Sequence, residues 1–300
     1  MEPKIREKQC KTALGDSAMR YDYCLNPYTG CLHSCQYCYA TFMRRFTGHL
    51  RDPWGSFADV KTNFVTVLAK ELPKRPGGSV WISSVCDPYQ QLEAKYKLTR
   101  SAIKLLSQFP KFKLSILTKS VMVLRDLDIL EPIRDRVEVA FSASTFDESA
   151  QKIFEPHAAP IAHRINAVKR LNDAGIATWF FIAPMLPYVT EIQLEEGLSR
   201  LRDAGVKHLE SDKYNPRGGI ITKTLAAYKA WDPNCDTEEI RNLLWHGDQY
   251  YHNLETRISD VWRTITPQGT YEKDQDYENL PRNRKIAQEV IVADRQHTLN

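Results

Sequence analysis

The sequence predicts an α/β fold built on a parallel sheet, because strand-like and helix-like segments alternate along its middle part. Short runs rich in β-branched or aromatic residues are each followed by an amphipathic segment of helical period. About six such units can be counted, fewer than the eight of a complete (β/α)₈ barrel. We therefore expect an open, TIM-like partial (β/α)₆ barrel with helices on its outside and a small helical extension at the C-terminus.

The first strand is expected near "MRYDYCLN", residues 19–26, directly before a cysteine-rich loop. The other strands are expected at 78–86, 113–120, 137–145, 176–184 and 206–212. Helices are expected between them, the clearest at 98–109, 162–175 and 191–205. The last two end in glycine, which favours a helix C-terminus.

These elements divide the chain into four parts. Residues 1–18 form an N-terminal arm and 19–218 form the barrel. Residues 219–265 form the helical extension, whose clearest element is "TEEIRNLLWHGDQYYHNLETRISDVWRTI". Residues 266–300 are polar, and we expect this tail to be loosely ordered.

Composition is that of an ordinary globular protein, with 42% hydrophobic and 26% charged residues. The most apolar stretch, near 178–189, is interrupted by Pro184 and Pro187 and is too short to cross a bilayer. The N-terminus has no apolar run typical of a signal peptide. Seven cysteines are an odd number and a poor pattern for a disulfide framework. The sequence therefore indicates a cytoplasmic protein without a membrane partner.

Charge is unevenly distributed along the chain. Residues 1–130 carry 20 Lys/Arg against 11 Asp/Glu, whereas residues 131–300 carry 21 against 26. A basic N-terminal half suits an anionic substrate such as DNA or RNA. A solvated, lysine-rich surface explains the same surplus equally well.

Three of the seven cysteines lie within "GCLHSCQYCYA", residues 30–40, as Cys31, Cys35 and Cys38. Thiolates select zinc, copper(I) or iron–sulfur clusters. A structural zinc site needs four protein ligands. The candidates for the fourth, none of which forms a second cysteine pair, are Cys24, Cys86, His33 and His49. A [4Fe–4S] cluster held by three thiolates would instead leave one iron open.

The CxxxCxxC spacing after a first strand, with Tyr37 before the last cysteine, resembles the radical S-adenosylmethionine (SAM) superfamily. Together with "SVCDPYQQLEAKYKLTR", "SILTKS" and "FSAST", it resembles the spore photoproduct lyase-related, DNA repair photolyase-like branch over about residues 20–215. The resemblance implies a partial barrel of the radical SAM type, with a [4Fe–4S] cluster and SAM as cofactors. It also implies a one-electron donor such as flavodoxin or ferredoxin.

The resemblance implies roles for individual residues. Cys31, Cys35 and Cys38 would hold the cluster, whose open iron would bind SAM. Reductive cleavage of SAM would give a 5′-deoxyadenosyl radical that abstracts a hydrogen from the substrate. Cys86 would return a hydrogen atom to the product radical, although free cysteines are also commonly buried structural residues.

Cofactor binding is expected of four further residues. Tyr37 would pack near the adenine, and Lys119 would contact the methionine carboxylate. Ser142 and Ser144, at the end of the fourth strand, would assist through their hydroxyl groups. Loop packing, a surface lysine and ordinary strand-end serines are the alternatives.

Several other residues are open to two interpretations. One group either lines the site or forms a turn: Asp87, Tyr89 and Gln90. Another group either contacts phosphates or lies on an exposed helix face: Arg44, Arg45 and His49. Cys10, Cys24 and Cys235 have no partner pattern and are interpreted as structural.

The leading hypothesis is a lyase-like radical SAM enzyme that acts on a DNA photoproduct or another nucleic acid. The first alternative keeps the chemistry but changes the substrate to a small molecule, a peptide or an RNA base. The second is a non-catalytic, zinc-binding nucleic-acid module. Nothing in the sequence identifies the substrate itself.

Overall fold

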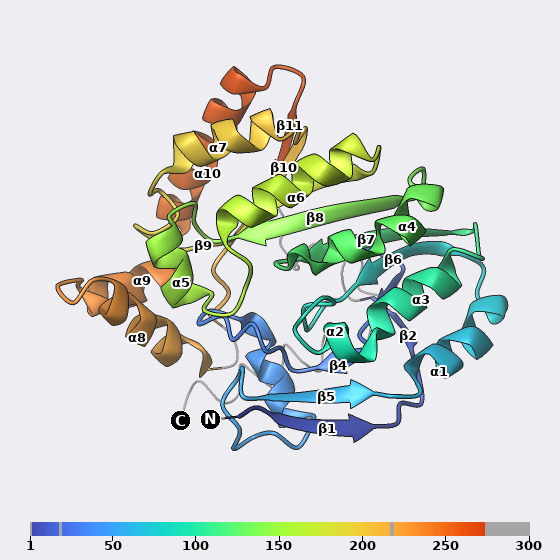
Figure 1. Cartoon of the computed structure of the whole chain (residues 1–300). Helices are drawn as coiled ribbons and strands as arrows, with labels where there is room; N and C mark the ends of the chain where they lie inside the picture. Colours follow the sequence, from blue (N-terminus) through green and yellow to red (C-terminus); the bar gives the residue numbers. More distant parts are fainter. Residues whose placement is uncertain (1, 18–19, 217–218, 274–300) are drawn as a thin grey trace.

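The computed structural model describes residues 2–17, 20–216 and 219–273, and its main feature is one curved, eight-stranded sheet (Figure 1). The strand order is β11-β10-β9-β8-β7-β6-β3-β2. Each neighbouring pair from β3 to β10 is parallel. These six strands are β3 (Tyr23–Leu25), β6 (Gly78–Ile82), β7 (Phe112–Thr118), β8 (Val137–Ala143), β9 (Ala177–Met185) and β10 (His208–Lys213). The predicted partial (β/α)₆ barrel is confirmed.

The sheet has two edge strands that the sequence pattern did not predict. β2 (Leu14–Asp16) pairs antiparallel with β3, and β11 (Thr270–Lys273) pairs parallel with β10. Both are too short and too polar to show a clear alternation of apolar residues. β11 falls within the segment expected to be a loose tail, of which residues 274–300 lie outside the described residues.

A second, three-stranded sheet has the order β1-β5-β4 and lies beside the lower end of the barrel (Figure 1). β1 (Lys4–Lys8) is parallel to β5 (Phe57–Lys61), which is antiparallel to β4 (Tyr28–Thr29). β1 belongs to the segment expected to be an arm, and its sequence KIREK has only one apolar residue. β4 leads directly into the cysteine loop, so this small sheet supports that loop.

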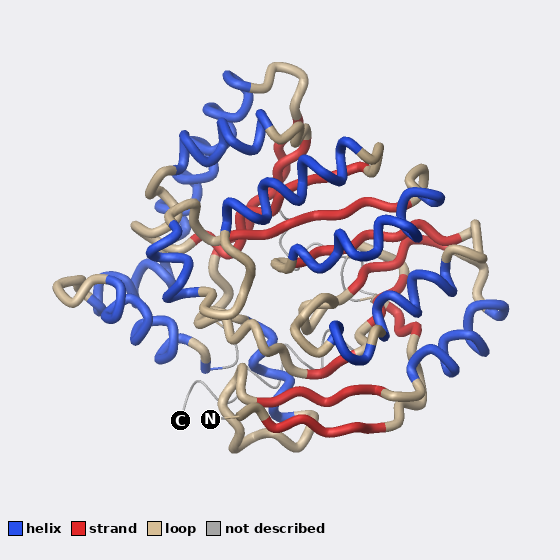
Figure 2. Tube along the Cα trace, in the orientation of Figure 1, coloured by secondary structure: helices blue, strands red, loops and turns tan. Residues whose placement is uncertain are grey.

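The helices pack on the outer face of the curved sheet (Figure 2). Along the barrel they are α1 (Phe64–Glu71), α2 (Glu93–Tyr96), α3 (Leu98–Leu106), α4 (Leu127–Leu130), α5 (Glu148–Phe154), α6 (Ile161–Asp173) and α7 (Leu194–Asp203). The helices predicted at 98–109, 162–175 and 191–205 correspond to α3, α6 and α7. As expected for parallel strands, the carboxyl ends of β6, β7 and β8, and the loops that follow them, lie at one edge of the sheet.

Three helices follow the last barrel strand: α8 (Ile221–Trp231), α9 (Thr237–His246) and α10 (Asp248–Ile265). The segment predicted as one helical element is two helices separated by Gly247. A Cβ at this glycine would lie 2.4 Å from the carbonyl oxygen of Leu243. Among the described residues, no helix combines the length and the apolar character needed to cross a bilayer.

Side chains on the barrel strands alternate between two apolar cores, as the period of a strand requires. On β9, Phe180 and Ile182 join the large core between the sheet and the outer helices. Trp179 and Phe181 point to the opposite face, where Trp179 packs with Trp81 inside the barrel. The interior of the barrel is therefore lined with aromatic rings.

We predict that Gly197→Ala destabilises the fold. Gly197 lies within α7, and a Cβ at this position would be 2.1 Å from the ring of Phe146. Alanine favours a helix by about 1 kcal/mol over glycine, but overpacking of a core costs about 1–3 kcal/mol. Urea denaturation should therefore show a lower free energy of unfolding. Glu196→Ala, at the exposed neighbouring position, is the control and should change stability little; equal effects in both variants would contradict this account.

Candidate active site around the cysteine loop

The three clustered cysteines lie on the loop between β4 and the 3₁₀ helix η1 (Tyr39–Arg45). Two backbone turns shape this loop: the amide of Ser34 donates to the carbonyl of Cys31, and that of Cys38 donates to the carbonyl of Cys35, each at 3.4 Å. All three cysteines line one cavity of ≈ 380 Å³ inside the barrel. The sequence spacing therefore gathers three thiols on one wall.

The side chain of Gln90 fixes the start of this loop. Its Nε2 donates to the carbonyl of Gly30 at 3.0 Å, and its Oε1 accepts from the amide of Leu32 at 3.1 Å. Gly30 has φ +84°, and a Cβ there would lie 2.6 Å from the carbonyl oxygen of Phe57. Only glycine fits this position. Gln90 is thus a support of the cysteine loop and is completely buried.

Burial raises the pKa of all three thiols. For Cys35 the pKa rises to about 12, with the positive charge of Lys119 acting in the opposite direction. Without a bound cation these cysteines are therefore neutral thiols at neutral pH. A metal or cluster that binds them must displace three protons, as is usual for thiolate ligands.

A buried ion pair lies directly behind the loop. The Tyr37 hydroxyl donates to Oε1 of Glu155, which also accepts from the Ser144 hydroxyl at 3.3 Å. Arg164 pairs with the other oxygen of Glu155 and donates to the carbonyl of Ser142 at 2.7 Å. Burial opposes the charge on Glu155, but Arg164 and its other partners outweigh it and lower the pKa of the carboxyl. This network ties the cysteine loop to β8 and α6.

Lys119, at the end of β7, reaches across to the end of β8. Its Nζ donates to Oγ of Ser142 at 2.7 Å and lies 5.8 Å from the centroid of the Tyr37 ring. Both Lys119 and Ser142 line the cavity. The structure thus brings together the lysine, the serine and the tyrosine that the sequence had selected, beside the three thiols. Ser144 and Tyr37 are bound to Glu155 and are not among the lining residues.

Asp87 joins two neighbouring strand ends. Its carboxylate accepts from the Thr118 hydroxyl at 2.8 Å and from the Lys119 amide at 2.7 Å. His33 Nε2 lies 3.2 Å from Asp87 Oδ2, close enough for an ion pair but not aligned as a hydrogen bond. Burial opposes ionisation of Asp87, but these partners lower its pKa to about 2. It is therefore a carboxylate at any physiological pH and holds Lys119 in place.

Cys86 lies in the loop after β6 and lines the same cavity as the clustered cysteines. Its Sγ is 3.5 Å from the carbonyl oxygen of Tyr28, and burial raises the pKa of its thiol to about 12. This side chain is therefore a protonated thiol. It packs among Tyr28, Val60 and Leu98, so a structural role and an active role are both compatible with its position.

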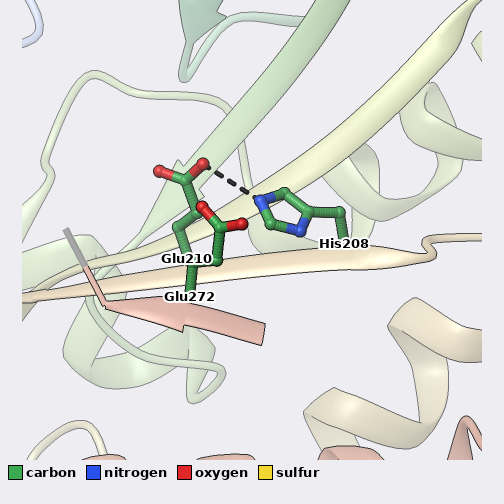
Figure 3. Close-up of side chains that lie close together, drawn as sticks. All are labelled: His208, Glu210 and Glu272. Carbon is green, nitrogen blue, oxygen red and sulfur yellow. Dashed lines mark hydrogen bonds and ion pairs between the residues drawn. The ribbon is translucent and has the colours of Figure 1, made fainter. Parts of the chain in front are cut away.

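The end of the cavity away from the cysteines is aromatic and charged. The guanidinium of Arg20 lies 5.7 Å from the centroid of the Trp179 ring and pairs with Glu210 at 2.5 Å. His208 Nε2 is 3.0 Å from the same carboxylate, and Glu272 on β11 is the cross-strand neighbour of Glu210 (Figure 3). The ligand atoms of His208, Glu210 and Glu272 lie within 4.8 Å of one another. Arg20 already neutralises Glu210, so we interpret this group as part of the cavity wall.

Other residues selected from the sequence lie elsewhere. Tyr89 is buried, and its hydroxyl donates to Asp126 Oδ2 at 3.0 Å, beneath the outer helices. His49 is completely buried and stacks on Phe57 with ring centroids 3.8 Å apart. It therefore neither faces solvent nor reaches a phosphate on the surface. Arg45 is exposed, which fits both interpretations of this residue.

Sequence reasoning missed the residues that position the site from behind. Glu155 and Arg164 belong to no motif and lie far along the chain from the cysteines they support. Arg20, at the other end of the cavity, also belongs to no motif. Arg164 sits on the buried face of an amphipathic helix, where an arginine requires a partner. An arginine on the apolar face of a predicted helix was the one sequence signal that could have indicated a buried ion pair at this position.

We predict that Arg164→Met destabilises the protein by about 3–5 kcal/mol, because it leaves the buried carboxylate of Glu155 without its main partner. In the wild type the pKa of Glu155 is lowered, so its stabilisation is present above the unfolded pKa and is lost as pH falls through the folded pKa. In the variant, burial favours the protonated acid. The deficit measured by denaturant titration should therefore be larger at pH 7 than at pH 5.

The control for this prediction is Arg170→Met on the exposed face of the same helix. It should leave the free energy of unfolding nearly unchanged. A deficit of Arg164→Met that did not depend on pH would show that the lost packing, and not the ion pair, is responsible.

Comparison with known proteins agrees with this site. The family model described as "Radical SAM superfamily" matches residues 25–209, which include all three clustered cysteines. The chain is 35% identical over 171 residues to an uncharacterized protein of Methanocaldococcus jannaschii, covering 57% of this chain and 63% of that protein. It is 30% identical over 256 residues to an uncharacterized protein of Acidianus two-tailed virus, covering 81% of this chain and 78% of that protein.

An uncharacterized protein of Mycobacterium tuberculosis is 30% identical over 215 residues, covering 67% of this chain and 62% of that protein. The matches therefore span less than two thirds of the archaeal and mycobacterial relatives' own lengths.

Among solved structures, spore photoproduct lyase complexed with a dinucleoside spore photoproduct matches with a TM-score of 0.65 and 17% identity. That match covers 90% of this chain and 82% of the other. A variant of the lyase with bound AdoMet and the same photoproduct gives a TM-score of 0.67 at 16% identity, with the same coverage. At these identities the likeness shows the fold. With the family model covering the cysteine loop and all but the edges of the barrel, the chain belongs to the radical SAM superfamily and has the fold of spore photoproduct lyase.

Proposed function

We propose that Cys31, Cys35 and Cys38 hold a [4Fe–4S] cluster and that the enzyme cleaves SAM to begin radical chemistry on a nucleic-acid substrate. The observation that carries the proposal is the three buried thiols on one wall of the cavity, with Lys119 and Ser142 beside them. Thiolates are the ligands that such clusters use. Among the described residues, only His208, Glu210 and Glu272 form a group of three whose ligand atoms all lie within 4.8 Å of one another, as ligands of a single metal ion would. The three thiols do not form such a group.

The zinc alternative needs a fourth ligand, and the candidates are engaged elsewhere. His49 contacts Asp59 at 2.9 Å and is stacked on an aromatic ring. Cys24 is on β3, where its sulfur accepts from Asn26. His33 contacts the carbonyl of His157 at 3.1 Å and is paired with Asp87, while Cys86 faces a backbone carbonyl. A multi-iron cluster with three protein ligands suits these residues better than a closed zinc site.

Lys119 is the proposed partner of the carboxylate of SAM. The carboxylate of Asp87 accepts a hydrogen bond from the Lys119 amide, and the Ser142 hydroxyl accepts one from Lys119 Nζ. The ammonium group is therefore already oriented. A charge-assisted hydrogen bond to a carboxylate is among the stronger polar contacts in proteins. Tyr37, fixed by Glu155, supports the loop between two of the cluster ligands in this proposal.

With cluster and SAM bound, the chemistry supplied to the site would be a 5′-deoxyadenosyl radical that takes a hydrogen atom from the substrate. The chain's part is to bind, orient and shield. The aromatic interior of the barrel restricts water, and Cys86 presents a neutral thiol whose S–H hydrogen can be transferred to a carbon radical. Cys86 is thus the proposed hydrogen-atom donor.

The proposed substrate is a nucleic acid, with a DNA photoproduct as the leading candidate. Three observations support it: the fold shared with a lyase that binds a dinucleoside photoproduct, the aromatic cavity wall, and the surplus of Lys/Arg in residues 1–130. Aromatic side chains stack on nucleobases in many single-strand binders. The one-electron donor that the cluster needs is proposed to be a flavodoxin or a ferredoxin.

A second candidate is a small molecule, a peptide or an RNA base. The far end of the cavity carries the carboxylates of Glu210, Asp212 and Glu272 against Arg20 and Lys273, which disfavours a phosphate at that position. A substrate with a neutral or cationic group at the far end fits this charge balance.

We predict that anaerobically reconstituted wild type, reduced with dithionite, forms 5′-deoxyadenosine from SAM and that Cys35→Ala does not, because a cluster ligand is missing. Product formation is measured by chromatography with and without ultraviolet-irradiated oligonucleotides. Cys235→Ala is the matched control, since that thiol is far along the chain from the loop and should leave activity intact. Zinc in place of iron, with no product, would refute the proposed chemistry. A product that forms equally with and without DNA, and DNA that stays unaltered, would favour the second candidate.

We also predict that Lys119→Met weakens SAM binding about tenfold or more, because a hydrogen bond to a charged group contributes about 1.5–3 kcal/mol. Lys113→Met, an exposed position on the same strand, should bind SAM like wild type. Equilibrium dialysis of the reconstituted proteins measures both. Unchanged affinity in Lys119→Met would remove this lysine from the proposed SAM site.

A further inference from the structure

Exposed apolar side chains gather on one short segment next to the cysteine loop. Among the described residues, five large hydrophobic side chains are exposed, and three of them lie within residues 39–51. Phe46 and Leu50 are the most exposed, each at 64%, and Tyr39 is at 38%. Single exposed hydrophobic residues are normal, whereas a group of them marks an interaction surface. We call residues 39–51 the patch segment.

The patch segment is held in its shape from beneath. His49, completely buried, contacts Asp52 at 2.6 Å and Asp59 at 2.9 Å. Arg44 donates to the backbone carbonyls of His49 and Leu50. With both flanks fixed, Phe46 and Leu50 are presented to solvent by a structured backbone. A preformed surface loses little conformational entropy when a partner binds.

The charge on this segment is entirely positive. Residues 39–51 contain three arginines and no aspartate or glutamate, and Arg45 and Arg51 are exposed. Lys4 and Lys8 on the neighbouring β1 adjoin the segment, but Lys4 pairs with Asp52 and Lys8 with Asp59, so the surplus of positive charge comes from the arginines of the segment itself. Apolar side chains surrounded by arginines are typical of protein interfaces. A complementary partner is acidic around an apolar centre.

This surface adjoins the proposed cluster ligands. The patch segment begins at the residue after Cys38, and both the backbone amide and the hydroxyl of Thr41 donate to the Cys38 carbonyl, at 3.2 and 2.8 Å. Ala40 packs against Cys31 in the same small apolar cluster. A carrier docked here would contact the stretch of chain that directly follows the proposed cluster ligands. Because electron transfer slows steeply with distance, this is a favourable point of entry.

We propose that the patch segment is the docking surface for a small acidic one-electron carrier, and this proposal rests on the proposed function. One electron passes from the reduced carrier to the oxidised cluster; the carrier is oxidised, the cluster is reduced, and no atom is transferred. Such complexes are small and transient, so electrostatic attraction sets much of their rate of formation. The association should therefore weaken as salt concentration rises.

The test uses a flavodoxin as the probe and two readouts. Binding of the flavodoxin to cluster-free protein is measured by calorimetry, and 5′-deoxyadenosine formation is measured with either reduced flavodoxin or dithionite as reductant. The variants are Phe46→Ser and Arg51→Glu. Their controls are Trp245→Ser, an exposed aromatic on α9, and Lys104→Glu, an exposed cation on α3. Thermal unfolding of every variant checks that it is folded.

We expect both patch variants to bind flavodoxin at least tenfold more weakly and to lose flavodoxin-driven activity in proportion. Dithionite-driven activity should stay within twofold of wild type, because dithionite needs no docking surface. Equal effects in the control variants, or unchanged binding in the patch variants, would overturn the proposal. So would weaker binding of an oligonucleotide with unchanged flavodoxin binding, which would assign the surface to nucleic acid.

The two proposals can fail separately. If wild type forms no 5′-deoxyadenosine even with dithionite, the proposed function is wrong whatever the docking result. If dithionite supports activity but flavodoxin does not bind, the chemistry stands and the docking surface is refuted.

Discussion

The rest of the site depends on one buried carboxylate, that of Glu155. A charged group without a partner is very costly in a protein interior, so its surroundings must supply hydrogen bonds and a counter-charge. Tyr37 comes from the cysteine loop, Ser144 follows β8 and Arg164 comes from α6, and all three meet at this carboxylate. If any of them moved, Glu155 would lose part of its compensation. The loop that carries the thiols is thereby fixed to the barrel by electrostatics as well as by packing.

A second constraint comes from the parallel sheet. The carboxyl ends of neighbouring parallel strands open on the same edge, so residues distant in sequence become neighbours there. Asp87 follows β6 and binds the end of β7, while Lys119 at the end of β7 binds Ser142 on β8. Each link joins one strand to the next. The result is a row of fixed polar groups beside the cysteine loop, which leaves Lys119 little freedom to turn away from a ligand.

Four barrel strands, β6 to β9, could be predicted because each is largely buried and rich in apolar residues, with a helical pattern next to it. β3 is short and β10, HLESDK, is mostly polar, so these two were placed by the elements next to them. The cysteine loop could be predicted because ligand spacing is a local property of the sequence. The partners of Glu155 could not, because a buried polar group is satisfied by whichever residues the fold brings near it. β1 and β11 were missed for another reason: KIREK and TYEK carry mostly polar or charged residues, and their pairing with β5 and β10 is set by tertiary contacts.

The two ends of the cavity differ in charge, and this difference bears on the proposed function. Near the thiols lies Lys119, whereas the far end carries Glu210, Asp212 and Glu272 with Arg20 and Lys273. Burial opposes ionisation of Glu210, but its bonds to His208 and Arg20 lower its pKa, so this carboxylate is charged at neutral pH. The three carboxylates outnumber the two cations at this end, so a phosphate placed there would meet a net negative charge. If the substrate is a nucleic acid, only a base can occupy this end, stacked against the aromatic wall, and its phosphates must remain at the mouth of the barrel. Recognition would then rest on the shape and hydrogen-bonding edge of the base, and attraction to the backbone would come from the protein's outer surface.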